Sequence, residues 1–73
     1  MKDKHEALVK ELHRRADYAL NSHSMNLTYE TYGMAKMAYS LDGITWAEFL
    51  ELNTKLVVKG LNDPAHCRLE AGV

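Results

Sequence analysis

Proline, cysteine and long apolar runs are nearly absent from this 73-residue chain. Because proline occurs only at Pro64 and the β-branched residues do not alternate with polar ones, no segment has the pattern of a strand. No run approaches the roughly 18 to 20 apolar residues that cross a bilayer, and the charged N-terminus lacks the apolar core of a signal peptide. The single cysteine, Cys67, cannot form an internal disulfide, which favours a reducing compartment. We therefore expect an all-α protein of the cytoplasm that does not contact a membrane.

The chain has no excess of charge of either sign. Nine basic and ten acidic residues leave a formal charge of −1, so composition provides no bulk attraction to nucleic acid or to a membrane surface. The apolar fraction of 47% is typical of a globular domain and too high for a disordered chain. The length predicts a single helical domain, 1–73, near the lower size limit for folding alone. Stabilisation by a second copy or by a partner fits this size.

Helical periodicity recurs in three segments, which are expected to form a small three-helix bundle. The predicted bundle consists of helices at about 4–21, 28–41 and 45–59, followed by a short C-terminal helical turn at about 64–70. No linker separates these segments and no internal repeat occurs.

Capping residues define the starts of the first two predicted helices. Asp3 is the expected N-cap of the first helix, with Glu6 three residues later in a capping-box spacing. Thr28 is the expected N-cap of the second helix, and Leu27 before it is expected to pack on Tyr32 as a hydrophobic staple.

The boundary between the second and third helices has the strongest signals in the chain. Asp42–Gly43 predicts a stop, because glycine tolerates the left-handed conformation that commonly ends a helix. Thr45 and Glu48 then form a T-x-x-E capping box, and Ile44 and Phe49 flank it with the spacing of a hydrophobic staple.

Two other glycines mark helical positions. Gly33 lies inside the second predicted helix, where glycine costs about 1 kcal/mol relative to alanine, so close approach of another helix is the expected reason for it. Gly60 is expected to end the third helix.

The predicted helix 28–41 is apolar on two faces, which is the most informative pattern in the chain. One face carries Tyr29, Tyr32, Ala35 and Tyr39, and the other carries Met34, Met37, Ala38 and Leu41. A central position between the other two helices would cover much of this surface. We expect one face to be buried internally and part of the other to be shared with another chain.

The third predicted helix presents an apolar face interrupted by one amide. This face consists of Trp46, Phe49, Leu50, Leu56 and Val57. Trp46 and Phe49 are expected in the core, and their alternative role is an anchoring pair for a partner. Asn53 among them either caps a backbone group, lies at the rim, or pairs with its own copy across a two-fold axis. The candidate interaction residues are Tyr29, Tyr32, Met34, Met37, Tyr39 and Asn53.

No constellation of residues has the spacing of a metal or catalytic site. His5, His13 and His23 are eight and ten residues apart, and adjacent His66 and Cys67 would point to different sides of a helix. The glycines stand alone, so there is no phosphate-binding loop. We therefore expect no enzymatic activity, no cofactor, no metal and no small-molecule substrate.

A DNA-binding helix-turn-helix is the alternative interpretation. Helix 28–41, the turn at Asp42–Gly43 and helix 45–59 have the required order. However, the first turns of the would-be recognition helix carry Glu48 and Glu51, which would face phosphate charge. The candidate nucleic-acid contacts instead lie on the first helix, at Lys10, Arg14 and Arg15.

The sequence thus favours a non-enzymatic protein–protein interaction module, expected to self-associate and to act as a regulator or adaptor. Its expected partner is a second copy, giving a homodimer, or another protein.

Overall fold

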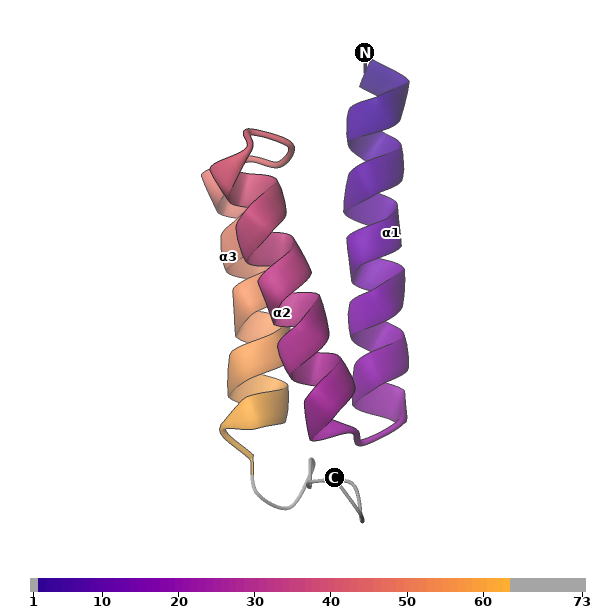
Figure 1. Ribbon diagram of the computed structural model, residues 1–73, viewed down its shortest axis with the longest axis vertical. Coiled ribbons are helices and arrows are strands. Elements are labelled where there is room, and N and C mark those ends of the chain that lie inside the picture. The colour runs from indigo at the N-terminus through magenta and orange to yellow at the C-terminus, as the bar shows by residue number, and fades with distance from the viewer. Residues whose placement is uncertain (1, 64–73) are drawn as a thin grey trace.

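Three helices in an up-down-up arrangement form the described part of the chain, residues 2–63 of a computed structural model (Figure 1). The elements are α1 (Lys2–Asn21), α2 (Met25–Ser40), α3 (Trp46–Asn53) and the π-helix η1 (Thr54–Leu61), which continues α3. No strand occurs within residues 2–63, so the predicted all-α, three-helix class is confirmed. The predicted helical turn at 64–70 lies outside the described residues, as do His66 and Cys67.

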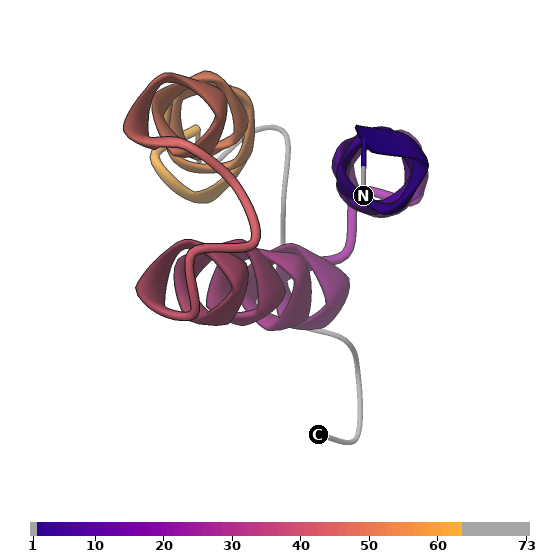
Figure 2. The ribbon, with the colours of Figure 1, turned by 90° about the horizontal axis from the view of Figure 1, so that it is seen from above.

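The second helix is the central one, as its two apolar faces predicted. It packs against α1 on one side and against α3 and η1 on the other (Figure 2). Both of these contacts are more extensive than the contact of α1 with α3 and η1. The buried core consists of Leu12, Ala16, Ala35, Ile44, Phe49, Leu52 and Leu56. Alongside Ala35, α2 buries two threonines, Thr28 and Thr31, and places Tyr32 and Met34 partly buried against this core.

The turn between α1 and α2 is three residues long, residues 22–24, and is organised by Ser24. His23 adopts a left-handed conformation (φ 53°), and its N–H donates to the Leu20 carbonyl, while the Ser24 N–H donates to the Ala19 carbonyl. This pair of bonds is a Schellman motif. The Ser24 hydroxyl then accepts the Leu27 N–H at 3.1 Å, so one residue closes α1 and caps α2.

Three predictions about helix starts are therefore wrong. Thr28 is not an N-cap, because Ser24 begins the helix one turn earlier and the Thr28 hydroxyl donates to the Ser24 carbonyl at 2.7 Å. Since Leu27 lies inside the helix, it cannot act as the staple on Tyr32. Asp3 is not the N-cap of α1, which already includes Lys2.

The turn between α2 and α3 also contains a Schellman motif. The prediction gave the left-handed conformation in this turn to the wrong residue. Asp42, not Gly43, is the left-handed residue (φ 62°). The Asp42 N–H donates to the Tyr39 carbonyl, and the Gly43 N–H donates to the Ala38 carbonyl at 2.7 Å. Gly43 is instead favoured by close approach, because a Cβ there would lie 2.9 Å from Leu8 Cδ2 and 3.2 Å from the Ala38 carbonyl oxygen.

The start of α3 confirms the predicted capping box. The Thr45 hydroxyl accepts the Glu48 N–H at 3.2 Å, and Glu48 Oε1 accepts the Thr45 N–H at 2.7 Å. Ile44 and Phe49 are both buried in the core, as expected of the residues that flank the box.

The predicted apolar face of this helix is only partly correct. Phe49 and Leu56 are buried, but Leu52, which the prediction omitted, is fully buried, while Trp46 is 54% exposed and Leu50 40% exposed. The helix is therefore rotated from the predicted orientation, because the neighbouring helices cover the side that carries positions 49, 52 and 56.

Gly60 does not end the third helix. The chain widens into η1 after Asn53 and continues to Leu61, and the Asn62 N–H donates to the Val57 carbonyl five residues earlier. Gly60 is buried within this segment.

Polar side chains bridge α1 to α3 and η1. His5 Nε2 lies 2.9 Å from Glu48 Oε2, near the start of α3. Lys55 Nζ donates to Asp17 Oδ1 at 2.9 Å and to His13 Nδ1 at 2.9 Å. Because an ammonium group only donates, His13 Nδ1 is the acceptor of this bond.

Candidate interaction surfaces

An aromatic cluster joins the end of α2 to the start of α3. The ring centroid of Trp46 lies 5.4 Å from that of Tyr39 and 5.8 Å from that of Phe49. Tyr39 and Phe49 are stacked, with centroids 5.5 Å apart. Phe49 is nearly buried, whereas Trp46 and Tyr39 lie above it with part of each ring exposed. These distances fall in the range that stabilises aromatic pairs.

Leu50 extends the exposed part of this cluster. It lies one turn after Trp46 on α3, and residues four apart share a helix face. We call the three exposed side chains, Tyr39, Trp46 and Leu50, the Trp46 surface. Neighbouring rings restrict the Trp46 rotamers, so covering its free side would lose less conformational entropy than covering a mobile side chain.

Acidic residues lie beside Leu50, one of the three residues of the Trp46 surface. Ala47, Glu48, Leu50, Glu51 and Thr54 line a shallow hollow along α3. The Thr45 N–H and then the His5 ring hold the pKa of the Glu48 carboxyl below its usual range, so it stays ionised at neutral pH. Glu51 is exposed, and His13 Nε2 lies 3.6 Å from its carboxylate. The hollow beside Leu50 therefore carries negative charge.

A second apolar surface lies on the outer side of α2, opposite its buried threonines. It carries Tyr29, 58% exposed, Gly33, and Met37, 60% exposed. These residues are spaced four apart and share one face. A Cβ built on Gly33 would meet nothing within 4 Å. The expected close approach to Gly33 is therefore not made by α1, α3 or η1. We call this surface the Gly33 face.

The six predicted interaction residues are not brought together in one surface. Tyr29 and Met37 belong to the Gly33 face and Tyr39 to the Trp46 surface, whereas Tyr32 and Met34 pack partly buried against the core.

Two residues of α3, Asn53 and Trp46, also differ in position from what the sequence predicted or left open. Asn53 is half-buried where α3 meets η1, and its side chain does not cap η1. Trp46 was expected in the core, with a partner anchor as the alternative, because large aromatics at helical spacing are usually core. Its exposure contradicts the first of these expectations. The sequence does contain a signal for it, since a face centred on Phe49, Leu52 and Leu56 leaves Trp46 at its edge.

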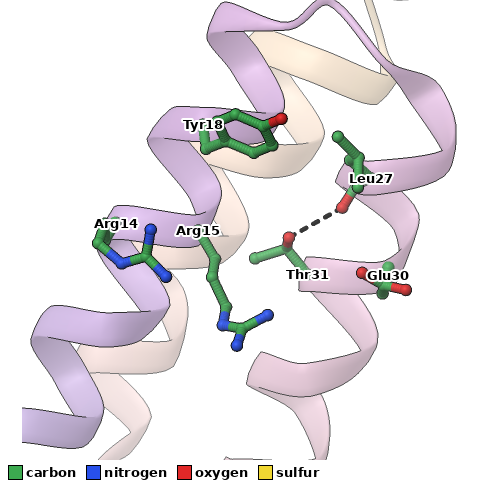
Figure 3. A pocket seen from close by; sticks show the side chains of 6 residues that line it. All are labelled: Arg14, Arg15, Tyr18, Leu27, Glu30 and Thr31. Carbon is green, nitrogen blue, oxygen red and sulfur yellow. Dashed lines mark hydrogen bonds between the residues drawn. The ribbon is translucent and has the colours of Figure 1, made fainter.

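Two of the three predicted basic residues of α1, Arg14 and Arg15, line a different feature, a hollow of about 220 Å³ between α1 and α2. Figure 3 shows Arg14, Arg15 and Tyr18 on α1 facing Leu27, Glu30 and Thr31 on α2. Only one hydrogen bond joins the drawn residues, from the Thr31 hydroxyl to the Leu27 carbonyl at 2.8 Å.

The two arginines of this hollow are already engaged. Arg14 Nη2 lies 2.6 Å and Arg15 Nε 2.7 Å from the same oxygen of Glu11. Hydrogen bonds from Arg14 and then from Arg15 lower the pKa of Glu11 to about 2, so its carboxylate holds both guanidinium groups at neutral pH. With Glu30 on the opposite wall, the charges of the hollow largely balance. Lys10 is exposed.

The arrangement of α2 and α3 also bears on DNA binding. The two helices lie side by side and run in opposite directions, as in an αα-hairpin (Figures 1 and 2). The pair in a helix-turn-helix crosses at about 90–120°.

The part of the chain at residues 4–63 contains neither a cluster of metal-binding side chains nor a membrane-spanning helix. No three histidine, cysteine, aspartate or glutamate side chains of this part lie together in a way that could hold a metal ion. None of the described helices is both long enough and apolar enough to span a bilayer. Comparisons of the chain with models of protein families, with curated proteins and with solved structures find no match.

Proposed function

We propose that this chain is a non-enzymatic helical interaction module of the cytoplasm, which binds protein partners and acts as a regulator or adaptor. One observation carries the proposal: the only tryptophan of the chain is 54% exposed although two rings hold it in place. Tryptophan and tyrosine dominate the energetics of protein interfaces, especially when they are rigid before binding.

The energetic argument favours a protein ligand. Aromatic side chains bury about 150–250 Å² each, so covering the free half of Trp46 removes roughly 100 Å² of mostly apolar surface from water. At about 25 cal/mol per Å², this contributes roughly 2–3 kcal/mol from one residue. The acidic residues of the hollow beside Leu50, Glu48 and Glu51, complement a basic segment on the partner.

The contacts of the basic residues do not favour the DNA-binding alternative. Arg14 and Arg15 share the Glu11 carboxylate, and α3 presents carboxylates at its start. Salt-dependent binding to random duplex DNA, lost in a variant carrying both Arg14→Ala and Arg15→Ala, would restore that alternative.

The proposal is tested by selecting peptides from a displayed random library against the immobilised 73-residue protein. We expect enriched peptides that contain basic and apolar residues. Their binding should fall at least tenfold with Trp46→Ala and shift the Trp46 fluorescence emission to shorter wavelength in the wild type. Val58→Ala is the matched control, because Val58 is equally exposed (58%) but lies on η1.

Peptides that bind the Trp46→Ala and wild-type proteins equally would contradict the proposal. The same holds if no sequence is enriched. Far-UV circular dichroism of each variant separates lost binding from lost folding.

A further inference from the structure

Gly33 occupies a position that its own chain does not explain. It lies in the middle of α2, where glycine weakens a helix, and no described atom would contact a Cβ there. Gly33 does not have a positive φ, so no conformational requirement at this position accounts for the glycine. A missing side chain on an exposed helix face does allow a second helix to approach closely.

The residues around Gly33 are arranged symmetrically. Tyr29 and Met37 lie four residues before and after it, and both are more than half exposed. Glu30 and Lys36 lie three residues before and after it, are exposed, and form no ion pair with any residue that the structure describes. In a helix these two charges fall on opposite flanks of the face, about 60° to either side of Gly33.

We propose that the Gly33 face binds a second copy of itself across a two-fold axis at Gly33. The Glu30 and Lys36 side chains lie at opposite ends of a line that crosses the face obliquely through Gly33. A two-fold axis perpendicular to that line places each Glu30 against Lys36 of the partner subunit. The same rotation leaves Tyr29 and Met37 each beside its own copy, with the two helices crossing at the glycines.

Charge favours this occupant on the Gly33 face but not on the Trp46 surface. The Gly33 face carries one acid and one base, so two copies are complementary. On α3, the hollow beside Leu50 carries two glutamates, Glu48 and Glu51, and no base among its lining residues, so a symmetric contact there would offer no opposite charge. Helices that cross at one point bury a small area, which predicts a weak, concentration-dependent dimer. This inference rests on the proposed interaction function and assigns self-association to α2.

Sedimentation equilibrium of the full chain, from micromolar to millimolar concentration, measures the dimer. Gly33→Ala should weaken dimerisation at least tenfold while raising the melting temperature of the monomer, because the added methyl improves helix propensity and has free space inside the chain. A purely structural role for Gly33 would not separate these two readouts.

Single charge reversals provide the second test. Glu30→Lys and Lys36→Glu should each weaken self-association about tenfold, because two attractive pairs become repulsive in the dimer. An equimolar mixture of the two variants should associate again, because each mixed dimer restores both opposite-charge pairs. Glu6→Lys and Lys59→Glu are matched controls, since both residues are exposed and lie on α1 and η1.

A strictly monomeric wild type at millimolar concentration would overturn the inference. So would a dimer that Gly33→Ala does not weaken, or a mixture of the charge variants that associates no better than each alone. Library-derived peptides that still bind Trp46 in these cases would show that the interaction function stands without the dimer.

Discussion

The turn between α2 and α3 yields a prediction in which two adjacent residues respond in opposite ways. A β-carbon at Gly43 would lie 2.9 Å from Leu8 Cδ2 and 3.2 Å from the Ala38 carbonyl oxygen. The leucine end can move, but the carbonyl is held by the 2.7 Å hydrogen bond from the Gly43 N–H. At Asp42, the left-handed backbone itself is the unfavourable feature.

The magnitudes follow from these contacts. Overpacking of this kind costs about 1–3 kcal/mol, and loss of glycine from the unfolded chain returns about 0.4–1 kcal/mol, so Gly43→Ala should destabilise by roughly 0.5–2 kcal/mol. Asp42→Gly relieves about 1–2 kcal/mol of left-handed strain and loses about 0.5–1 kcal/mol through backbone entropy. It should therefore stabilise the fold by about 0.5–1 kcal/mol.

Urea unfolding followed by far-UV circular dichroism measures both changes. Leu8→Ala completes a double-mutant cycle, because removing the Leu8 side chain removes the closest contact of the new methyl group. Gly43→Ala should then be less destabilising by about 0.5–1 kcal/mol in the Leu8→Ala background. An equal effect in both backgrounds would show that Leu8 is not the contact that disfavours a side chain at position 43. A destabilising Asp42→Gly would refute the strain assigned to the left-handed Asp42.

Two further predictions concern the core and the acid response. Leu52→Ala removes a fully buried side chain and should cost about 2–5 kcal/mol, which approaches the whole stability of a domain of this size. A cooperative thermal transition retained within a few degrees of the wild type would contradict that burial. Glu11, whose pKa is lowered from 4.5 to about 2, and Glu48, whose pKa is also lowered, both stabilise the fold when ionised. Their contribution is complete above about pH 4.5 and is lost as pH falls toward 2, so Glu11→Gln should flatten the acid limb of a pH titration of urea stability. An unchanged acid limb in this variant would mean that Glu11 is not paired in solution.

The sequence alone predicted the exposure of some, but not all, of the residues on the two candidate surfaces. Tyr29, Met37 and Tyr39 were predicted as interaction residues and are exposed. Tyr32 was predicted with them, yet it is partly buried against the core. The centroid of its ring lies 6.3 Å from that of Phe49. Trp46, by contrast, was expected in the core and is exposed. The size of an aromatic side chain does not determine which side of its helix the other helices cover.

The sequence by itself determined the features that depend on residues within one turn of each other. The Thr45–Glu48 capping box is an example, since both of its hydrogen bonds join residues three apart. The number of helices and their approximate extents follow from the same kind of short-range information, because helical periodicity and caps repeat over a few residues.

Only the tertiary structure decided which of several locally acceptable choices is used. Ser24 and Thr28 can both cap a helix, and Ser24 does so because the same residue also closes α1. Leu52 is buried and Trp46 exposed because of where α1 and α2 lie around α3. Gly33 faces open space because neither neighbouring helix reaches the outer side of α2. These choices depend on contacts between residues far apart in the chain, and helical periodicity carries no information about such contacts.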